Sequence, residues 1–197
     1  GKIDEFSPQS KKVHIDIDPS SINKIIKVDL SIVGDVSDVI SSTTKTLKNK
    51  KLNLEKSNKQ KISNWWQQIE KWRTKQSLSF VNSDTIIKPQ YAVQRLYELT
   101  KDSDTYITTE VGQHQMWAAQ HYKFDKPNRW MTSGGSGTMG FGLPAAIGVQ
   151  IANPGKLVVD IAGEASVLMT IQEMSTAVQY RLPIKIFILN NYLHFIT

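Results

Sequence analysis

Oxygen-bearing side chains follow two consecutive predicted strands in the second half of this chain. Glu164 lies in a Gly-Glu-Ala-Ser turn, and Asn190 and Asn191 follow it by 26 and 27 positions, after the apolar run 184–189. The carboxyl ends of neighbouring parallel strands meet at one edge of a sheet, which would bring a carboxylate and an amide oxygen together. Mg²⁺ prefers oxygen ligands and often shares them with a substrate phosphate. The spacing therefore predicts a metal-bridged diphosphate site.

The elements that would position these residues alternate between strands and helices. Predicted strands lie at 105–108, 156–161 and 184–189, and predicted helices at 89–100, 116–121, 143–152 and 171–181. This alternation is typical of a doubly wound parallel α/β sheet, in which ligands bind at the carboxyl ends of the strands.

The first part of the chain has too few elements for a domain of its own. It contains a predicted strand at 13–18 that stops at Pro19, a second strand at 30–33 and a helix at 36–47. Two strands and a helix cannot bury an independent core. We therefore expect residues 1–47 to be the end of a larger domain, 48–85 to be a basic linker with a helix, and 86–197 to begin the second domain.

Composition excludes several classes of protein. The 197 residues are 40% hydrophobic and 21% charged, as in ordinary globular proteins, and they include no cysteine for a disulfide or a thiolate metal site. No apolar run approaches the roughly 20 residues that cross a bilayer. The chain begins at Gly1 without an initiator methionine or a signal-like apolar segment, so we expect it to be the interior of a longer cytoplasmic protein.

The net charge of +6 is concentrated in one segment. Residues 45–75 contain ten lysines and arginines, only two acidic residues, and three tryptophans. Such a segment could bind nucleic acid through phosphate contacts and stacking. No nucleic-acid motif accompanies it, so the favoured interpretation is a solvated linker leading into a helix.

A glycine motif supports a competing hypothesis. Residues 135–140 form a G-x-G-x-x-G sequence, and Asp160 follows Gly140 by twenty positions at a predicted strand end. That spacing is typical of a nicotinamide-dinucleotide-binding dehydrogenase domain. Two points count against this hypothesis. The sequence of residues 130–132 before the turn does not predict a good buried strand, and the hypothesis does not explain the pattern of Glu164 and Asn191.

Several longer motifs resemble one enzyme family, the large (catalytic) subunits of acetolactate synthase, also called acetohydroxyacid synthase. The matching segments are 1–6, 14–19, 111–120, 133–148, 172–177, 182–183 and 190–191. The resemblance covers nearly the whole chain except residues 45–85 and 192–197.

The resemblance implies an enzyme that uses thiamine diphosphate, Mg²⁺ and FAD. Family members join decarboxylated pyruvate to a second 2-keto acid, pyruvate or 2-ketobutyrate, in the biosynthesis of branched-chain amino acids. They form homodimers or tetramers with a regulatory small subunit, and neither nucleic acid nor membrane is a partner. This chain would supply the C-terminal part of the Rossmann-like, FAD-associated central domain and the N-terminal part of the diphosphate-binding domain.

The resemblance also assigns roles to individual residues. The metal ligands would be Glu164, Asn191 and the carbonyl of Leu193. The diphosphate would be held by Gly163, Ala165 and Ser166 through backbone and hydroxyl donors. The cofactor site would be lined by Val111, Gly112, Gln113 and His114, with the Gly137 carbonyl on the aminopyrimidine and Met139 enforcing the cofactor's bend. The FAD contacts would be Asp16 and Asp35.

Three departures from the family pattern affect these assignments. The family usually has aspartate where Glu164 stands, and residues 192–197 differ from the glycine- and methionine-containing segment expected there. The pyrimidine domain, which carries the glutamate that activates the cofactor, has no counterpart in these residues. We therefore expect this chain to contain no catalytic residue and to be inactive by itself.

Overall fold

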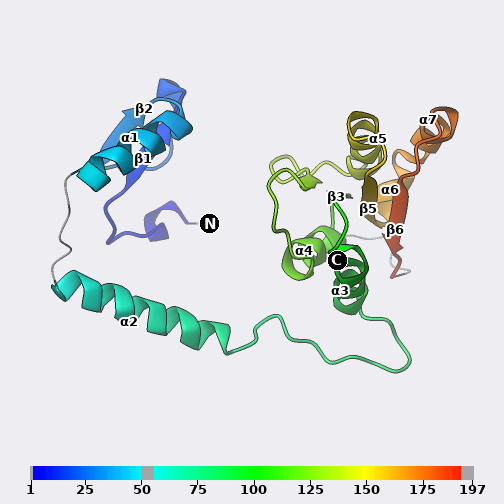
Figure 1. The fold of residues 1–197 in the computed structure, drawn as a ribbon, viewed down its shortest axis with the longest axis horizontal. Coiled ribbons are helices and arrows are strands. Elements are labelled where there is room, and N and C mark those ends of the chain that lie inside the picture. Colours follow the sequence, from blue (N-terminus) through cyan, green and yellow to red (C-terminus); the bar gives the residue numbers. More distant parts are fainter. Residues whose placement is uncertain (1, 50–55, 192–197) are drawn as a thin grey trace. The chain divides into compact units, whose positions relative to one another are not determined.

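The structure is a computed structural model that describes residues 2–49 and 56–191. It divides into two units, residues 1–75 and 76–197, and each is described by itself (Figure 1). Among the described residues, no helix is both long and apolar enough to cross a membrane.

The first unit contains a small parallel sheet and two α-helices. Strand β1 (Val13–Asp16) pairs with β2 (Leu30–Val33), and the short helices η1 (Ile3–Glu5) and η2 (Pro19–Ser21) flank β1. The two α-helices are α1 (Val36–Asn49) and α2 (Lys56–Arg73). Helix α2 lies within residues 48–85, the basic segment in which we expected a helix.

This unit has no core among its described residues. None of the residues 2–49 and 58–75 is buried, and Val13, Val33 and Ile40 are each more than half exposed. The tryptophans of α2 are also about half exposed, although Trp65 packs edge to face on Trp72. Apolar residues of β1, β2 and α1 therefore need a covering surface that these residues do not supply.

The second unit is built on a four-stranded sheet in the order β4-β3-β5-β6, and every neighbouring pair is parallel. The strands are β3 (Thr105–Thr109), β4 (Trp130–Thr132), β5 (Leu157–Gly163) and β6 (Lys185–Leu189). Strand β4 was not predicted from the sequence. It is three residues long and pairs only with β3, with Trp130 opposite Ile107.

Helices cover both faces of this sheet (Figure 1). One face packs on α3 (Pro89–Thr100) and α4 (Gln113–His121). The other packs on α5 (Gly142–Ala152), α6 (Glu164–Leu168) and α7 (Met174–Gln179), with η3 (Ile171–Glu173) between the last two.

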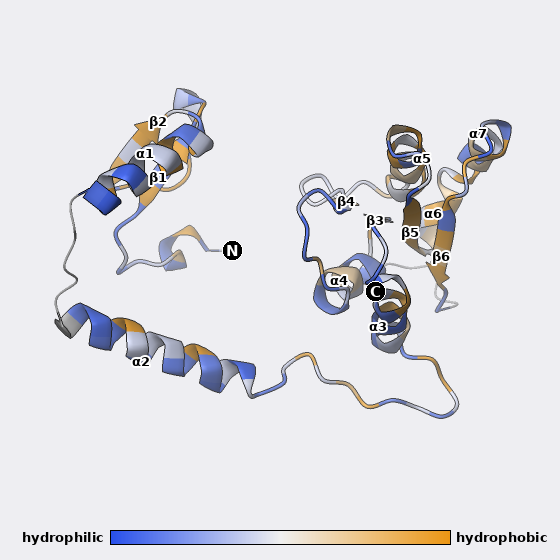
Figure 2. Cartoon of the chain, viewed as in Figure 1, coloured by the Kyte–Doolittle hydropathy of each residue, from blue (hydrophilic) through white to orange (hydrophobic). Residues whose placement is uncertain are grey.

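The side chains of strand β5 pack against the helices on both faces of the sheet. Val159 and Ile161 belong to the α3 and α4 core, whereas Ala162 belongs to the core under α5, α6 and α7. Successive side chains of a strand point to opposite faces, so a strand buried on both sides is apolar at nearly every position. Figure 2 shows β5 as a hydrophobic strand. The predicted doubly wound parallel fold is confirmed.

The strand order places a switch point between β3 and β5. After β3 the chain passes through α4 on one face to β4, and after β5 it enters α6 on the other face. Because the connections leave in opposite directions, a crevice opens beyond the carboxyl ends of these two adjacent strands.

Candidate functional site

A pocket lies at this switch point. Twelve residues line it: Val111, Gly112, Gln113, His114, Trp117, Met139, Gly163, Glu164, Ala165, Ser166, Leu189 and Asn191. Ten of the twelve are residues to which the family resemblance assigned contacts with the cofactor or the metal. They come from four separate segments, so the fold brings together positions as far apart as 111 and 191.

The register of β5 and β6 explains how Glu164 and Asn191 reach the same pocket. Gly163 pairs with Leu189, so both strands end at the same level. Glu164 follows Gly163 as the first residue of α6, and Asn191 lies two residues beyond Leu189. Both side chains belong to pocket-lining residues, which is the juxtaposition that the spacing predicted.

His114 forms one wall of the pocket and is almost fully buried. A methyl group added at Gly112 or Gly163 would lie 2.7 Å from its imidazole ring, so both positions require glycine for the ring to fit. Burial lowers the pKa of His114 to about 4, although the Glu110 backbone and the Glu164 charge oppose this shift. The ring is therefore neutral at neutral pH, and its Nε2 has no hydrogen-bond partner among the described residues.

Two family profiles match the chain. The central domain of thiamine pyrophosphate enzymes matches residues 1–43, and their C-terminal TPP binding domain matches residues 110–197. The second match includes the whole set of pocket-lining residues. The chain belongs to the thiamine pyrophosphate enzymes.

Acetolactate synthases are close relatives within this family. The chain is 48% identical to the isozyme 3 large subunit of Escherichia coli over 95% of its length, 44% identical to the large subunit of Haemophilus influenzae over 96%, and 44% identical to the chloroplastic acetolactate synthase 1 of Nicotiana tabacum over 97%. It spans 32%, 32% and 28% of these proteins, or about a third of their length. The family recognised from the sequence motifs is confirmed.

Three predicted residues of this thiamine pyrophosphate enzyme, Gly137, Asp16 and Asp35, are not among those that line the pocket. Gly137, with a positive φ of 62°, lies beside it, because a methyl group there would be 3.9 Å from Val111 Cγ1. Leu193 lies outside the described residues. Asp16 and Asp35 are in the first unit, where their carboxylates accept hydrogen bonds from the backbone N–H groups of Asp18 and Ser37.

Besides Leu189, which lines the pocket at the end of β6, two residues at the site were missed by the sequence analysis. Trp117 lines the pocket from α4, one helical turn after Gln113, so helical spacing could have found it. Glu110 is fully buried directly beneath the pocket, at the end of β3. A single acidic residue after a strand carries no motif, and nothing in the sequence indicated its long-range contacts.

The Ser166 hydroxyl, which the resemblance assigns to the diphosphate, has another hydrogen-bond partner in this structure. The Ser166 hydroxyl donates to Glu110 Oε2 at 2.9 Å, so its proton is already engaged beneath the pocket. The first backbone N–H groups of a helix have no intrahelical partner. The N–H groups at the start of α6, which follow Gly163, are therefore the donors that remain for an anion.

The dinucleotide-binding hypothesis fails at its acidic residue. Asp160 was predicted to end a strand, but β5 continues to Gly163 and Asp160 is fully buried in its middle. Its Oδ1 accepts a hydrogen bond from the Thr108 hydroxyl at 3.0 Å, so it cannot reach a ribose at the edge of the sheet. The strand that this hypothesis requires before the glycine-rich turn is present as β4. The dehydrogenase hypothesis is nevertheless not supported, because Asp160 is buried.

Proposed function

We propose that this chain is part of an acetolactate synthase large subunit and forms the diphosphate-binding half of its thiamine diphosphate site. The observation that carries this proposal is the convergence of ten predicted residues in one pocket at the switch point of the sheet. The whole enzyme would join decarboxylated pyruvate to a second 2-keto acid, either pyruvate or 2-ketobutyrate.

The pocket residues fit a diphosphate held through a metal ion. Glu164 and Asn191 offer a carboxylate and an amide oxygen, which are ligands suited to Mg²⁺, and Leu193 would add its carbonyl. A carboxylate beside a diphosphate is repulsive unless a cation lies between them, so the presence of Glu164 in the pocket supports a metal-bridged arrangement.

The remaining pocket residues would bind and orient the cofactor. Gly163, Ala165 and Ser166 would hold the diphosphate through backbone N–H groups. The neutral His114, whose other ring nitrogen bonds to the Glu110 backbone, would accept a hydrogen bond at Nε2. Val111, Gly112 and Gln113 would line the cofactor, with Met139 and Gly137 on its other side. When bound, thiamine diphosphate supplies the electron sink for decarboxylation.

The first unit would belong to a central domain that binds FAD. The match of residues 1–43 to the central domain supports this placement, and so does the absence of buried residues among 2–49. Asp16 and Asp35 would contact FAD, residues 48–85 would link the domains, and residues 86–197 would start the diphosphate-binding domain. We also propose a cytoplasmic homodimer or tetramer with a regulatory small subunit, and expect the 197 residues alone to be inactive.

Calorimetry with thiamine diphosphate and Mg²⁺ tests the proposed site on the complete natural polypeptide that contains these residues. Wild type should bind in a Mg²⁺-dependent manner, and Asn191→Ala should weaken binding by about tenfold or more, because one metal ligand is lost. Asn82→Ala is the matched control, since Asn82 is an exposed loop residue. Equal affinities of wild type and Asn191→Ala would refute the assignment.

A further inference from the structure

Glu110 joins three segments that build the pocket. It is fully buried at the end of β3, immediately before the pocket-lining Val111. Its Oε2 accepts hydrogen bonds from the Gly140 N–H at 2.7 Å and the Ser166 hydroxyl at 2.9 Å, and its Oε1 accepts one from the Leu143 N–H at 3.0 Å. These donors are 30 to 56 residues away along the chain.

Two of the three donors belong to segments that line the pocket, and the third begins α5. Gly140 follows the pocket-lining Met139 and has a positive φ of 83°, so this carboxylate holds the glycine-rich turn where its backbone adopts a conformation suited to glycine. Leu143 is in the first turn of α5, whose own N-cap residue Phe141 makes no side-chain hydrogen bond to the helix. Glu110 therefore caps α5 from a distance, where a negative charge stabilises the unpaired N–H groups.

Glu110 lies in a closely packed region that also contains a second buried carboxyl group. A methyl group at Gly142 would lie 2.7 Å from the Glu110 nitrogen, so the start of α5 rests directly on the end of β3. The nearby Asp160 is also buried, and burial together with the Glu110 charge raises the pKa of Asp160 to about 7. Protonation of Asp160 allows two buried carboxyl groups to share this region without mutual repulsion.

We propose that Glu110 is a positioning residue that holds the glycine-rich turn and α6 in the arrangement that binds thiamine diphosphate. This inference rests on the proposed function. The same carboxylate fixes the backbone next to Met139 and the side chain of Ser166, which belong to two separate segments of the pocket lining. Its loss should weaken cofactor binding more than it slows the reaction of the bound cofactor.

Glu110→Gln tests the inference in the complete natural polypeptide. A glutamine has one acceptor oxygen for three donors, and its NH₂ group would face an N–H or O–H donor. The Kd for thiamine diphosphate, measured by calorimetry with Mg²⁺, should rise by about tenfold or more, which corresponds to one net hydrogen bond. The turnover number at saturating cofactor should stay within about threefold of wild type, which corresponds to a change of less than about 1 kcal/mol in the activation free energy.

Thr108→Val is the matched control. It is nearly isosteric, lies two residues earlier on the same strand, and removes a buried hydrogen bond to Asp160 rather than one to a pocket segment. It should lower the unfolding midpoint and leave the cofactor Kd unchanged.

Glu110→Asp is a second test variant, which keeps the charge but is one methylene shorter. It should raise the Kd by about threefold, and it decides the question if Glu110→Gln does not fold.

The outcomes separate this inference from the proposed function. If wild type binds thiamine diphosphate and the Glu110 variants bind it equally well, the positioning role is overturned while the proposed function stands. If Thr108→Val weakens binding as much as Glu110→Gln, Glu110 has only a general structural role and the inference is also overturned. If wild type does not bind, both the proposed function and the inference fall.

Discussion

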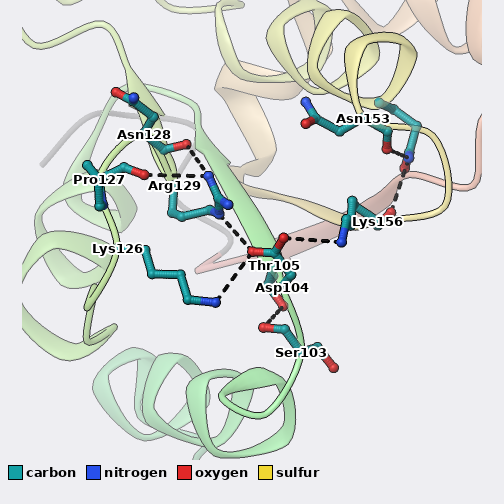
Figure 3. Close-up of polar contacts among 10 residues, drawn as sticks. Ser103, Asp104, Thr105, Lys126, Pro127, Asn128, Arg129, Asn153 and Lys156 are labelled. Atoms are coloured by element: carbon teal, nitrogen blue, oxygen red, sulfur yellow. Dashed lines mark hydrogen bonds and ion pairs between the residues drawn. The ribbon is translucent and has the colours of Figure 1, made fainter.

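The two ends of the four-stranded sheet are built from opposite chemistry. At the amino end, Asp104 forms ion pairs with Lys126 at 3.7 Å, Arg129 at 2.9 Å and Lys156 at 3.3 Å (Figure 3). These residues lie just before β3, β4 and β5, so one carboxylate links the starts of three strands. All four side chains are partly exposed to water.

The carboxyl end instead buries its polar groups. Glu110 is fully buried and His114 is nearly so, and Asp160 is fully buried near them in the middle of β5. His114 Nε2 and Asp160 Oδ2 have no hydrogen-bond partner among the described residues. Unpaired buried polar atoms are costly for stability and are concentrated where a protein binds or reacts. We therefore assign stability to the exposed ion pairs at one end and ligand binding to the close-packed polar groups at the other.

Gly142→Ala should have the largest effect of the substitutions that test this comparison. The added methyl group would collide with Asp160 Oδ1 and would lie 2.7 Å from the Glu110 nitrogen and 2.8 Å from the Thr109 carbonyl carbon. Backbone atoms cannot move aside, so we expect a loss of about 4 kcal/mol or more in the free energy of unfolding, measured by denaturant titration.

Gly148→Ala provides the control on the same helix. A methyl group there has no neighbour within 4 Å, and alanine favours a helix by about 1 kcal/mol over glycine. This variant should therefore be as stable as wild type or slightly more stable. A Gly142→Ala protein with wild-type stability would show that the start of α5 is not close-packed on β3.

Asp160→Asn should change how stability depends on pH. The pKa of Asp160 in the folded protein is about 7, raised from an ordinary value of 3.8 mainly by burial. Between these values the folded state holds a proton that the unfolded state has released, so the unfolding free energy falls as pH rises. This group contributes a slope of about 1.4 kcal/mol per pH unit, and asparagine removes it.

The measurement is the difference in unfolding free energy between variant and wild type from pH 4 to 8. His114 contributes the opposite slope between about 4 and 6.5, because burial lowers its pKa, and the difference cancels its contribution. The stability of Asp160→Asn relative to wild type should increase up to about pH 7 and then level off. A difference that does not vary with pH would contradict the buried, protonated state of Asp160.

Much of the fold and the pocket could be predicted from the sequence. Strands β5 and β6 are largely apolar, β3 is rich in β-branched residues, and a glycine or amide motif follows each of the three, so both their type and the edge at which they meet were evident. The placement of Glu164 and Asn191 followed from the 27 positions between them, since a helix and one strand of ordinary length fill that interval.

Other features depend on tertiary contacts that no local pattern records. Strand β4 has three residues and a partner on one side only, too short for a periodic signal. Helix α2 begins among lysines and asparagines that local composition assigns to a linker. The contacts of Glu110 and the mid-strand burial of Asp160 arise because residues up to 56 positions away pack against them.

Asp104→Asn should have the smallest effect and should act on stability alone. The Arg129 hydrogen bond, followed by that of Lys156, keeps the pKa of Asp104 below its ordinary value of 3.8. This stabilising contribution is present above the unfolded-state pKa and disappears as the pH falls through the folded-state value.

Because the ion pairs of Asp104 are partly exposed, dissolved salt screens them. Asp104→Asn should slightly lower the thermal midpoint at low salt, and the difference from wild type should shrink as salt is added. The affinity for thiamine diphosphate should not change, because Asp104 lies at the opposite end of β3 from the pocket. A variant with wild-type stability but weaker cofactor binding would reverse the roles that we assign to the two ends of the sheet.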